Sequence, residues 1–598
     1  MGLTTSRSLG VNATYDWKRV KLRSNIQYVG TDRLEDSRTT VDNYIRKDKS
    51  ITRSTNNSRT ENNNLVANAF LEWKMDSVTT LIFRPQYRFS ANDRENKGFQ
   101  EGWGNDVLLN EKVSSGSNHN SQYNVTMMLQ LSRKLSQKGR NVALKVDYGT
   151  NSSSNDRKNL STTHYFKNDR EDSKNQKIED DIDGYNYRVQ LVYVEPLLWM
   201  HHLQLRYSYQ YSDRFVYDWN EDLGEFTPDY DESASNQFEN QYSNHLLNLA
   251  VRTSRKKYNY NVGVDLEPQK SVSHSLLSDP PEEPLKRSVL NFSPTVNFRY
   301  KFSKRTRLQI VYRGKGRQPN VRDLQPVEDR TNPLNIRIGN PALKPSYTNT
   351  FTLNFNSYHT KRQRNIVASL LVENTVNSVT NQVTYDEETG GRVTTPMNMN
   401  GNWRALGSFS LNTPFRNRSW IFRTYSYVQY RNQNGYTTLN REEPMKSTVK
   451  HLTARERLQL TYRTCQVEIT GFAGLLYNSS YNNVGEKRTE TYDYQIGTQL
   501  QLYLPWGVEL YTDLTYFIRE GYDYEGNARE NFMWNSQLSK AFLKKKQLLI
   551  RFKIYDILHQ DISLVRTITP SAIRDVDYNA LGSYFMVHVI LRLNLMGH

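Results

Sequence analysis

Two short stretches contain residue types that bind metals or phosphate groups in other proteins. Asp181, Asp183 and Gly184 have the spacing that opens a calcium loop, but no Glu follows at the distance that such a loop requires. Residues 314–316 (Gly-Lys-Gly) lack both the spacing of a phosphate-binding loop and a following helix. We therefore predict no metal site and no cofactor, and we expect the acidic stretch to be a solvated loop. The alternative is a divalent cation held there that bridges lipopolysaccharide.

Catalytic patterns are equally sparse. The chain contains no Gly-x-Ser-x-Gly elbow and no His-Glu-x-x-His sequence. Its one cysteine, Cys465, excludes an internal disulfide and a zinc site built from several thiolates. His201 and His202 are adjacent, so in an extended chain they face opposite ways, which favours an interfacial anchor over a metal site. The sequence therefore predicts a protein that is not an enzyme.

The composition indicates which kind of secondary structure the chain forms. Only 36% of the 598 residues are hydrophobic, yet the chain contains 40 Tyr, 22 Phe and 9 Trp. Disordered chains are poor in aromatic residues, so the polar and apolar side chains must be finely segregated instead. Alternation along β-strands achieves this segregation. No run of about 18 apolar residues occurs, so no transmembrane helix is expected.

Alternation of period two recurs along the whole chain. It is clearest at the C-terminal end, where Phe585, Val587, Val589, Leu591 and Leu593 alternate with polar or mixed residues. We count about 23 such strands of about ten residues, the length that a tilted membrane-spanning strand needs. The sequence predicts an all-β fold, a large antiparallel transmembrane β-barrel of about 22–24 strands, as one domain over residues 1–598. We expect the five apolar residues above to face lipid.

The connections between these strands alternate in length. One kind is tight and basic, as at 255–257, 303–305, 361–362, 416–418 and 544–546. The other kind is long and rich in Asn, Ser, Asp and Glu, as at 32–63, 92–121, 150–184 and 217–240. Short turns at one rim and long loops at the other are typical of an outer-membrane barrel. We therefore predict that all long connections lie at one end of the barrel.

The net charge of +17 raises the question of a nucleic-acid partner. The basic residues cluster in the tight turns rather than along one element that would fit a groove. We therefore expect them to contact lipid phosphates, and we expect no nucleic acid. Outer-membrane lipid and lipopolysaccharide are the predicted partners.

One rigid segment precedes the strand that begins near Thr348. It consists of Gly339, Asn340, Pro341, Ala342, Leu343, Lys344 and Pro345. The two prolines fix φ and push the residue before each toward extended geometry, while Gly339 can adopt positive φ. We expect this segment to set the register of the following strand rather than to contact a ligand.

The same segment carries a resemblance. Together with "QPNVRDLQP" at 318–326 and "NPL" at 332–334, it resembles TonB-dependent receptor barrels, and in particular the receptor-like outer-membrane β-barrel proteins. The stretches 552–560 and 585–594 are similar to the closing strands of that family. Ser346 stands where the family often has Glu. The resemblance implies a Gram-negative outer-membrane location, an N-terminal plug domain and an energy-coupling partner.

No room for a plug exists before residue 9 of this sequence, so we expect any plug or coupling segment to be encoded upstream. The function that follows is the uptake of a bulky extracellular ligand such as a glycan, a peptide or a metal chelate. A structural or partner-binding outer-membrane barrel without transport remains an alternative. An outer-membrane hydrolase and a soluble glycan-binding β-protein are less favoured alternatives.

Aromatic residues in the long connections are the candidates for ligand capture, because exposed rings stack on sugars or heterocycles. They are Phe99, Trp103, Tyr217 and Trp219. The alternative is that these rings pack the loops on one another.

The direction of the first strand leads to a further prediction. The strand at 9–17 runs into the tight turn at Lys18 and Arg19, and the last strand follows a longer connection at 562–581, so both descend toward the short-turn rim. We therefore expect the barrel to lack at least one ascending strand upstream. It would then be open, or closed by a parallel seam between these two strands.

Overall fold

The computed structural model describes residues 3–44, 49–197, 201–223, 228–230, 236–276, 283–324, 328–329, 334–386, 389–439, 443–484, 486–522, 530–543, 547–560, 563–568, 572–578 and 583–591. Nearly all of them are in strands, as the sequence predicts. No helix in these ranges is long and apolar enough to span a bilayer.

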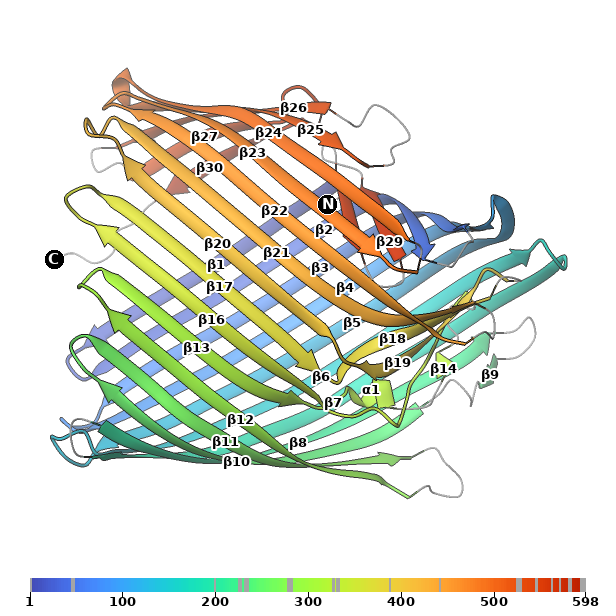
Figure 1. The fold of residues 1–598 in the computed structure, drawn as a ribbon, viewed down its shortest axis with the longest axis horizontal. Helices are drawn as coiled ribbons and strands as arrows, with labels where there is room; N and C mark the ends of the chain where they lie inside the picture. The colour runs from blue at the N-terminus through green and yellow to red at the C-terminus, as the bar shows by residue number, and fades with distance from the viewer. Residues whose placement is uncertain are drawn as a thin grey trace.

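The wall of the molecule is one antiparallel meander (Figure 1). Of the 30 strands that the described residues form, seven lie outside the wall, which leaves 23 wall strands, within the predicted range. Each wall strand pairs with the next along the wall. In order they are β1 (Leu3–Trp17), β2 (Val20–Tyr44), β3 (Lys49–Lys74), β4 (Thr79–Gly104), β5 (Val107–Lys134), β6 (Asn141–Tyr165), β7 (Arg170–Pro196), β8 (His201–Leu223), β10 (Asn236–Ser254), β11 (Tyr258–Ser275), β12 (Leu285–Lys301), β13 (Thr306–Arg317), β16 (Ser346–His359), β17 (Arg364–Val376), β20 (Asn402–Pro414), β21 (Trp420–Leu439), β22 (Met445–Arg463), β23 (Val467–Asn482), β24 (Lys487–Leu504), β25 (Val508–Glu520), β26 (Glu530–Phe542), β27 (Leu548–Tyr555) and β30 (Tyr584–Leu591).

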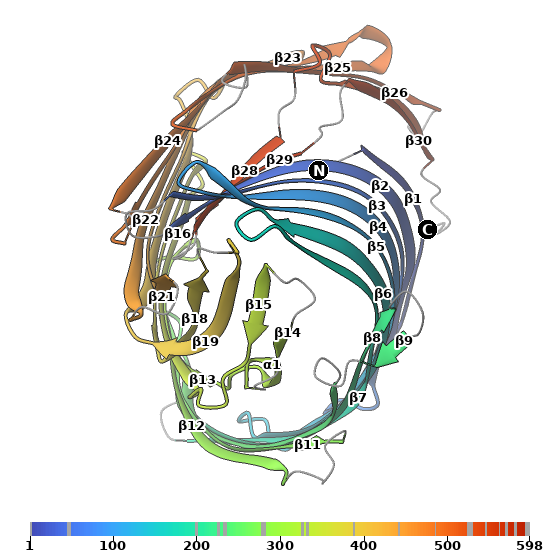
Figure 2. The same ribbon diagram turned by 90° about the vertical axis from the view of Figure 1, so that its right-hand side faces the viewer.

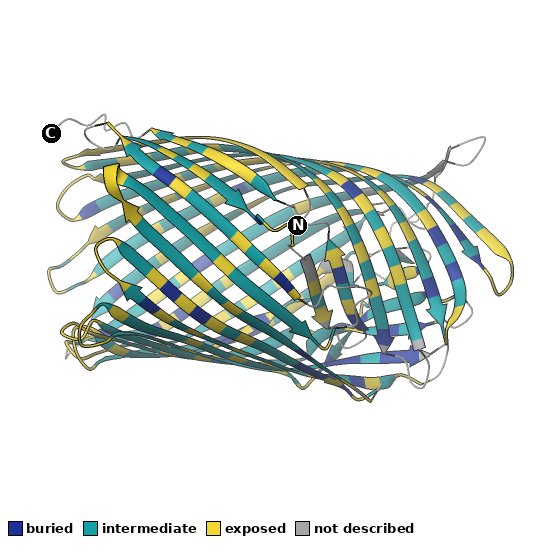
Figure 3. Cartoon of the chain, turned by 90° about the horizontal axis from the view of Figure 1, so that it is seen from above, coloured by how far each residue is buried: buried dark blue, intermediate teal, exposed yellow. Residues whose placement is uncertain are grey.

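An apolar belt runs across the wall near the tight turns. Because the registers align, apolar residues of successive strands stand opposite one another. In the first half one such row is Trp17, Val20, Trp73, Leu81, Leu131, Leu144, Leu191, Tyr207, Leu247, Leu266 and Phe292. In the second half another row is Val467, Leu502, Leu510, Leu538, Phe552 and Val587. The alternation of more and less exposed residues is visible along the strands in Figure 3.

The two kinds of connection lie at opposite ends of the wall, which confirms the prediction for the connections that the structure describes; the turn at 544–546 lies outside the described residues. The tight turns join β1 to β2, β3 to β4 and so on at one end, which we call the tight-turn end. The other end, which we call the ribbon end, differs from the expectation of long loops. Most of 32–63, 92–121 and 150–184 is strand, and β2 to β7 are 25–28 residues long rather than about ten. These hairpins extend the wall as ribbons.

Short elements lie inside the ring of wall strands at the ribbon end (Figure 2). The β13–β16 connection contains α1 (Val321–Leu324), β14 (Glu328–Asp329) and β15 (Asn335–Ile338), and the β17–β20 connection contains β18 (Ser378–Tyr385) and β19 (Arg392–Met399). We call β14, β15, β18 and β19 the inner layer. β15 pairs with β19, and β18 pairs with the end of β21, both in parallel. A separate hairpin, β28 (Ser563–Ile568) with β29 (Ala572–Tyr578), lies in the β27–β30 connection, and β9 (Pro228–Tyr230) pairs in antiparallel with the end of β8.

Buried apolar residues gather where these short elements meet the wall rather than along a central core. Leu343, Val383 and Tyr385 are each less than 6% exposed, and Val449 of β22 packs on Ile573 of β29. Most of the buried apolar side chains among the described residues therefore lie at the ribbon end.

Candidate functional site

The rigid segment at 339–345 is held by residues from three other parts of the chain. Arg287 of β12 donates hydrogen bonds to the carbonyl oxygens of Pro341 and Leu343, the latter at 3.0 Å. The N–H of Asn340 donates to the carbonyl oxygen of Asp323 at 2.6 Å, and Arg337 forms an ion pair with the Asp323 carboxylate at 2.5 Å. The segment thus ties α1 and β15 to the wall.

Asn398 of β19 completes this arrangement. Its Oδ1 accepts the N–H of Lys344 at 2.6 Å, and its Nδ2 donates to the carbonyl oxygens of Lys344 and Asn377 at 2.8 and 2.9 Å. Asn340 Nδ2 donates to the carbonyl oxygen of Pro396 at 3.0 Å. One side chain therefore joins two long connections. The following strand, β16, begins at Ser346, two residues earlier than predicted.

The β18–β19 hairpin reaches wall strands that are remote in sequence. Tyr385, 4% exposed, donates from its hydroxyl to Asn43 Oδ1 of β2 at 3.2 Å. Asn110 of β5 donates from Nδ2 to the carbonyl oxygen of Thr389 at 2.5 Å. Gly390 has a φ of +67°, and a Cβ there would lie 2.6 Å from Asn110 Nδ2, so both backbone and space require glycine. The hairpin therefore braces one side of the ring against another.

The β28–β29 hairpin forms a second brace. β29 pairs with β2 from Ser37 to Asn43. Arg566 of β28 forms an ion pair with Asp575 at 2.6 Å and lies 4.8 Å from the ring centre of Tyr522. Together with the inner layer, this hairpin occupies the mouth of the ring at the ribbon end (Figure 2).

A hollow of about 650 Å³ adjoins β29 on the ribbons. Phe99, Val113 and Tyr578 supply apolar and aromatic surface, and Arg38, Lys97, Asp36 and Asp577 supply charge. Phe99 and Phe89 are both at odd positions of β4, with no register shift between them, so Phe99 faces the side that bears the belt. Burial raises the pKa of Asp577, while Arg38 opposes that rise.

The other predicted capture residues also lie in strands rather than loops. Tyr217 and Trp219 of β8 stack on each other, with ring centres 6.1 Å apart, and Trp219 donates from Nε1 to Glu221 at 3.0 Å. Trp103, near the tip of β4, donates from Nε1 to Glu101 at 3.1 Å. Tyr217 is in register with Ala91, eight residues from Phe99 and four strands away, which places the two rings roughly 30 Å apart along the sheet. The four residues do not form one site.

The stretches with possible metal or phosphate chemistry are also placed in strands. Asp181 and Asp183 lie within β7, not in the loop that we expected, and residues 314–316 lie within β13. His201 begins β8 beside a tight turn, where its Nδ1 lies 2.8 Å from the hydroxyl of Tyr260. The contact between His201 and Tyr260 fits the role of an interfacial anchor at the tight-turn end.

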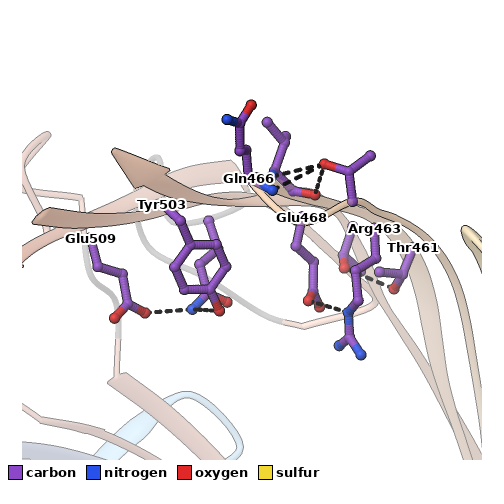
Figure 4. A network of polar contacts seen from close by, with 10 residues as sticks. Thr461, Arg463, Gln466, Glu468, Tyr503 and Glu509 are labelled. Carbon is purple, nitrogen blue, oxygen red and sulfur yellow. Dashed lines mark hydrogen bonds and ion pairs between the residues drawn. The ribbon is translucent and has the colours of Figure 1, made fainter. Parts of the chain in front are cut away.

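Polar side chains occupy the opposite side of the wall from the belt. Figure 4 shows Arg463, Glu468, Tyr503 and Glu509 on one side of the sheet and Gln466 on the other. Arg463 Nε lies 2.6 Å from Glu468, and Gln501 donates to the Tyr503 hydroxyl and to Glu509 at 2.9 and 2.5 Å. One apolar side and one polar side are what a lipid-exposed wall around an aqueous lumen requires.

One ionisable group at the ribbon end is strongly perturbed. Burial of Lys112, and next the positive charge of Lys174, lowers the pKa of Lys112 to about 8. Nearby, burial raises the pKa of Tyr165. Both groups lie on the ribbons, beyond the apolar belt.

Comparison with known proteins agrees with this architecture. Residues 133–587 match the outer membrane protein beta-barrel family. The chain belongs to this family. The resemblance to receptor-like outer-membrane barrels is thereby confirmed, and the protein is located in the outer membrane. In such a barrel the tight turns face the periplasm and the ribbons face the cell exterior.

No curated protein matches the chain. Among solved structures, it is similar to the outer membrane transporter YddB from Escherichia coli (11% identity, 94% of this chain, 76% of that chain, TM-score 0.43). It is also similar to the siderophore receptor PirA from Acinetobacter baumannii (9% identity, 98% of this chain, 81% of that chain, TM-score 0.44). The copper transporter OprC is a third similar structure (9% identity, 98% of this chain, 81% of that chain, TM-score 0.46). Likenesses of this strength do not assign a ligand.

Several residues of the ribbon end were not identified from the sequence. Arg287, Asn398, Tyr385 and Tyr578 form contacts whose partners lie far along the chain, so no local spacing marks them. The "GNPALKP" segment was a visible signal, but its partners were not.

Proposed function

We propose that this chain is the barrel of an outer-membrane receptor that takes part in the uptake of a bulky ligand, such as a glycan, a peptide or a metal chelate. The observation that carries the proposal is the braced mouth of a wide wall. Barrels of 16–18 strands already leave an aqueous channel, and wider transporters keep the lumen plugged. A 23-strand wall needs its lumen controlled, and segments of its own chain occupy its mouth.

The bracing contacts support a mouth that changes state rather than a permanently open pore. Two of the bracing contacts, Tyr385–Asn43 and Asn110–Thr389, are hydrogen bonds between polar groups, each worth only about 1 kcal/mol net, whereas the β28–β29 hairpin is held on β2 by a ladder from Ser37 to Asn43. A ligand that binds at the ribbon end can therefore compete with the two hydrogen bonds of the β18–β19 hairpin. The proposal includes a plug domain and an energy-coupling partner in the periplasm, which the family resemblance implies.

Capture by aromatic residues is part of the same proposal. Phe99 lines the hollow beside Arg38 and Lys97, so a flat ring or sugar face could stack there while charges fix its orientation. The Tyr217–Trp219 stack offers a second aromatic surface on β8. Because the two surfaces are far apart, they would bind separate parts of a large ligand or separate molecules.

The experiment compares cells that make the protein with cells that lack its gene, by mass spectrometry of the growth medium. We expect at least one solute too large for general porins to be depleted only by cells that make the protein. Restoring the gene should restore that depletion. Identical depletion in all strains would favour the alternative, a structural or partner-binding barrel without transport.

A further inference from the structure

A charged side chain, Glu456 of β22, lies on the lipid side of the wall within the apolar belt. Thr461 and Arg463 of the same strand are on the lumen side (Figure 4). β22 has no register shift, and Glu456 is an odd number of positions from both residues, so it faces lipid. The exposure of the strand agrees, because Leu458 and Leu460, on the side of Glu456, are 45% and 42% exposed.

Two pairs of aromatic residues mark the depth of Glu456 in the membrane. Near the tight turns Trp420 of β21 is opposite Tyr462 of β22, with ring centres 4.9 Å apart. Toward the ribbon end Trp403 of β20 and Tyr430 of β21 have ring centres 5.0 Å apart. Trp and Tyr gather at the two interfaces of a bilayer. The ten residues from Trp420 to Tyr430 rise roughly 25 Å along a tilted strand, the height of the apolar band of an outer-membrane barrel.

The register places Glu456 inside this band. It stands directly opposite Ser426 of β21, between the two aromatic pairs, and Thr424 of β21 donates a hydrogen bond to its Oε1 at 2.5 Å. A carboxylate can accept about four hydrogen bonds, and the hydrocarbon offers no water to donate the others. Ionised groups inside a membrane are normally paired with an opposite charge. The described residues give Glu456 no such ion pair.

A second copy of this chain does not offer the missing positive charge. On the lipid side of the described wall strands, Lys and Arg lie within two residues of the tight-turn end of a strand, as Lys540 and Arg133 do, or at least ten residues from it, as Arg7 does. Glu456 is seven residues from that end of β22. Two copies in the same membrane orientation would therefore offer each other apolar residues or a second negative charge at this level.

The surface around Glu456 has small side chains. Ser426 is across the sheet from it, Ala454 is next on its own side of β22, and Ala473 of β23 is diagonal to it. Gly471 follows on β23, where an added Cβ would meet no atom within 4 Å. Small residues let another membrane-spanning segment approach closely. A long basic side chain of a neighbouring protein could therefore reach the carboxylate.

We propose that Glu456 is the contact point for a different outer-membrane protein, whose membrane-spanning surface carries one Lys or Arg at this depth. The basic group would form an ion pair with Glu456, and the hydroxyl of Thr424 would hold the carboxylate in place. Lipid phosphates do not fit, because they are negative and lie at the interfaces. This inference is independent of whether the protein transports a ligand.

The test places a photo-crosslinking residue at Leu475 of β23, which is directly opposite Glu456 and 37% exposed. Intact cells of the bacterium that carries the gene are irradiated, and the adducts are mapped by mass spectrometry. We expect one major adduct, with a membrane-spanning segment of another protein that has Lys or Arg beside the labelled position. Glu456→Gln keeps the shape but removes the charge, and should reduce this adduct about ten-fold or more.

Two controls accompany this measurement. The same cross-linking residue at Val146 of β6, on the lipid side of the belt in the other half of the wall, should give labelling that Glu456→Gln leaves unchanged. Heat-modifiable migration should be the same with and without Glu456→Gln, which shows that the barrel still forms.

Exchange of the charges tests the pairing itself. Glu456→Arg alone, and replacement of the partner's basic residue by Glu alone, should each reduce the adduct, and the two together should restore it. If Glu456→Arg prevents folding, Glu456→Gln is combined with replacement of the partner's basic residue by Met. The two neutral changes together should then lose no more adduct than either change alone, because they remove the same interaction.

The outcomes separate clearly. An adduct that depends on Glu456 and returns on charge exchange, or shows the same loss for single and double neutral changes, supports the proposal. An adduct that Glu456→Gln leaves unchanged, or a labelled segment without Lys or Arg, would overturn it. Adducts with lipid alone, or with a second copy of this chain alone, would also overturn it.

Discussion

Tyr385 and Asn43 are 342 residues apart in sequence, and the tyrosine hydroxyl donates a 3.2 Å hydrogen bond to the asparagine side chain. The contact joins the β18–β19 hairpin to the end of β2. We call the inner layer together with the β28–β29 hairpin the mouth cover. One attachment of the mouth cover is thus a residue pair that no local sequence pattern predicts. Both side chains are buried, which gives the bond more weight than an exposed contact would have.

Tyr385→Phe should loosen the mouth cover without unfolding the wall. The variant keeps the ring but removes the donor, at a cost of about 1 kcal/mol. Amide hydrogen exchange over 378–399 should accelerate several-fold, while exchange in β22 and β23 stays unchanged. Equal exchange in the variant and the wild type would show that the bond does not hold the hairpin.

Asn398 offers a test of the junction between the two long connections. Asn398→Asp keeps the acceptor for the Lys344 N–H but sets a carboxylate oxygen against the carbonyl oxygens of Lys344 and Asn377, whereas Asn398→Ala loses all three contacts. Lys344 is exposed and Asn377 is half-buried, so each lost hydrogen bond costs about 0.5–1.5 kcal/mol net. Proteolysis within 378–399 should therefore increase in both variants. The role assigned to Asn398 is wrong if neither variant is cleaved faster than the wild type.

The alternation of Phe585, Val587, Val589 and Leu591 was legible in the sequence because one side of this strand meets lipid. The strands of the ribbons could not be predicted in the same way, because the outer parts of β2 and β3 meet water on both sides and show no alternation of apolar and polar residues. They are strands nonetheless, since each residue has a ladder partner, as Thr31 has in Asn62. Asn, Ser and Asp are common in loops, and this tendency was overridden by pairing between strands.

The site was less predictable than the wall. The "GNPALKP" segment was found because its prolines constrain the backbone. Its contacts with Arg287 and Asn398 join residues that are more than 50 positions apart, so the sequence did not predict them. The capture residues were chosen as loop aromatics. They lie in strands, and the spacing between Phe99 and Tyr217 separates them into two surfaces.

Val589→Arg tests the orientation of the last strand. The side chain is 67% exposed within the protein and would face lipid, so a guanidinium there should cost roughly 2–4 kcal/mol near the midplane. Met586→Arg, on the lumen side of the same strand, is the matched control and should cost much less. The comparison is the denaturant midpoint of heat-modifiable migration. Equal losses for the two variants would contradict the assignment of faces.

Lys112 predicts a pH dependence at the ribbon end. Its pKa is lowered from 10.5 to about 8, so the folded state binds fewer protons than the unfolded state between those two values. The free energy of unfolding of the ribbons around Lys112 should increase as pH rises from about 8 to 10.5. Below pH 8 the cost of burying the charged lysine should be constant. Lys112→Met should remove this slope in the exchange of β5 and β6. A wild-type slope of opposite sign would show that the lysine is stabilised in its charged form.

Phe99→Ala and Tyr217→Ala test capture separately, because the two rings are not in one site. Each should weaken the binding of the solute that cells with the protein deplete, because each removes an aromatic surface. Val107→Ala, at an exposed ribbon position away from both rings, is the control. Unchanged binding in both aromatic variants would remove them from the capture step.

The central claim is that a wide outer-membrane wall, with its mouth covered by its own segments, admits a bulky ligand. The most direct measurement uses the barrel of residues 1–598 made without any plug segment, replaces 378–399 with a short Gly-Ser turn, and follows the entry of a large hydrophilic antibiotic into cells that make the variant. We expect sensitivity to rise at least ten-fold over cells with the unsubstituted barrel, while heat-modifiable migration shows that the barrel still forms. Unchanged sensitivity in a folded variant would contradict the account, because the β18–β19 hairpin would then not control the mouth.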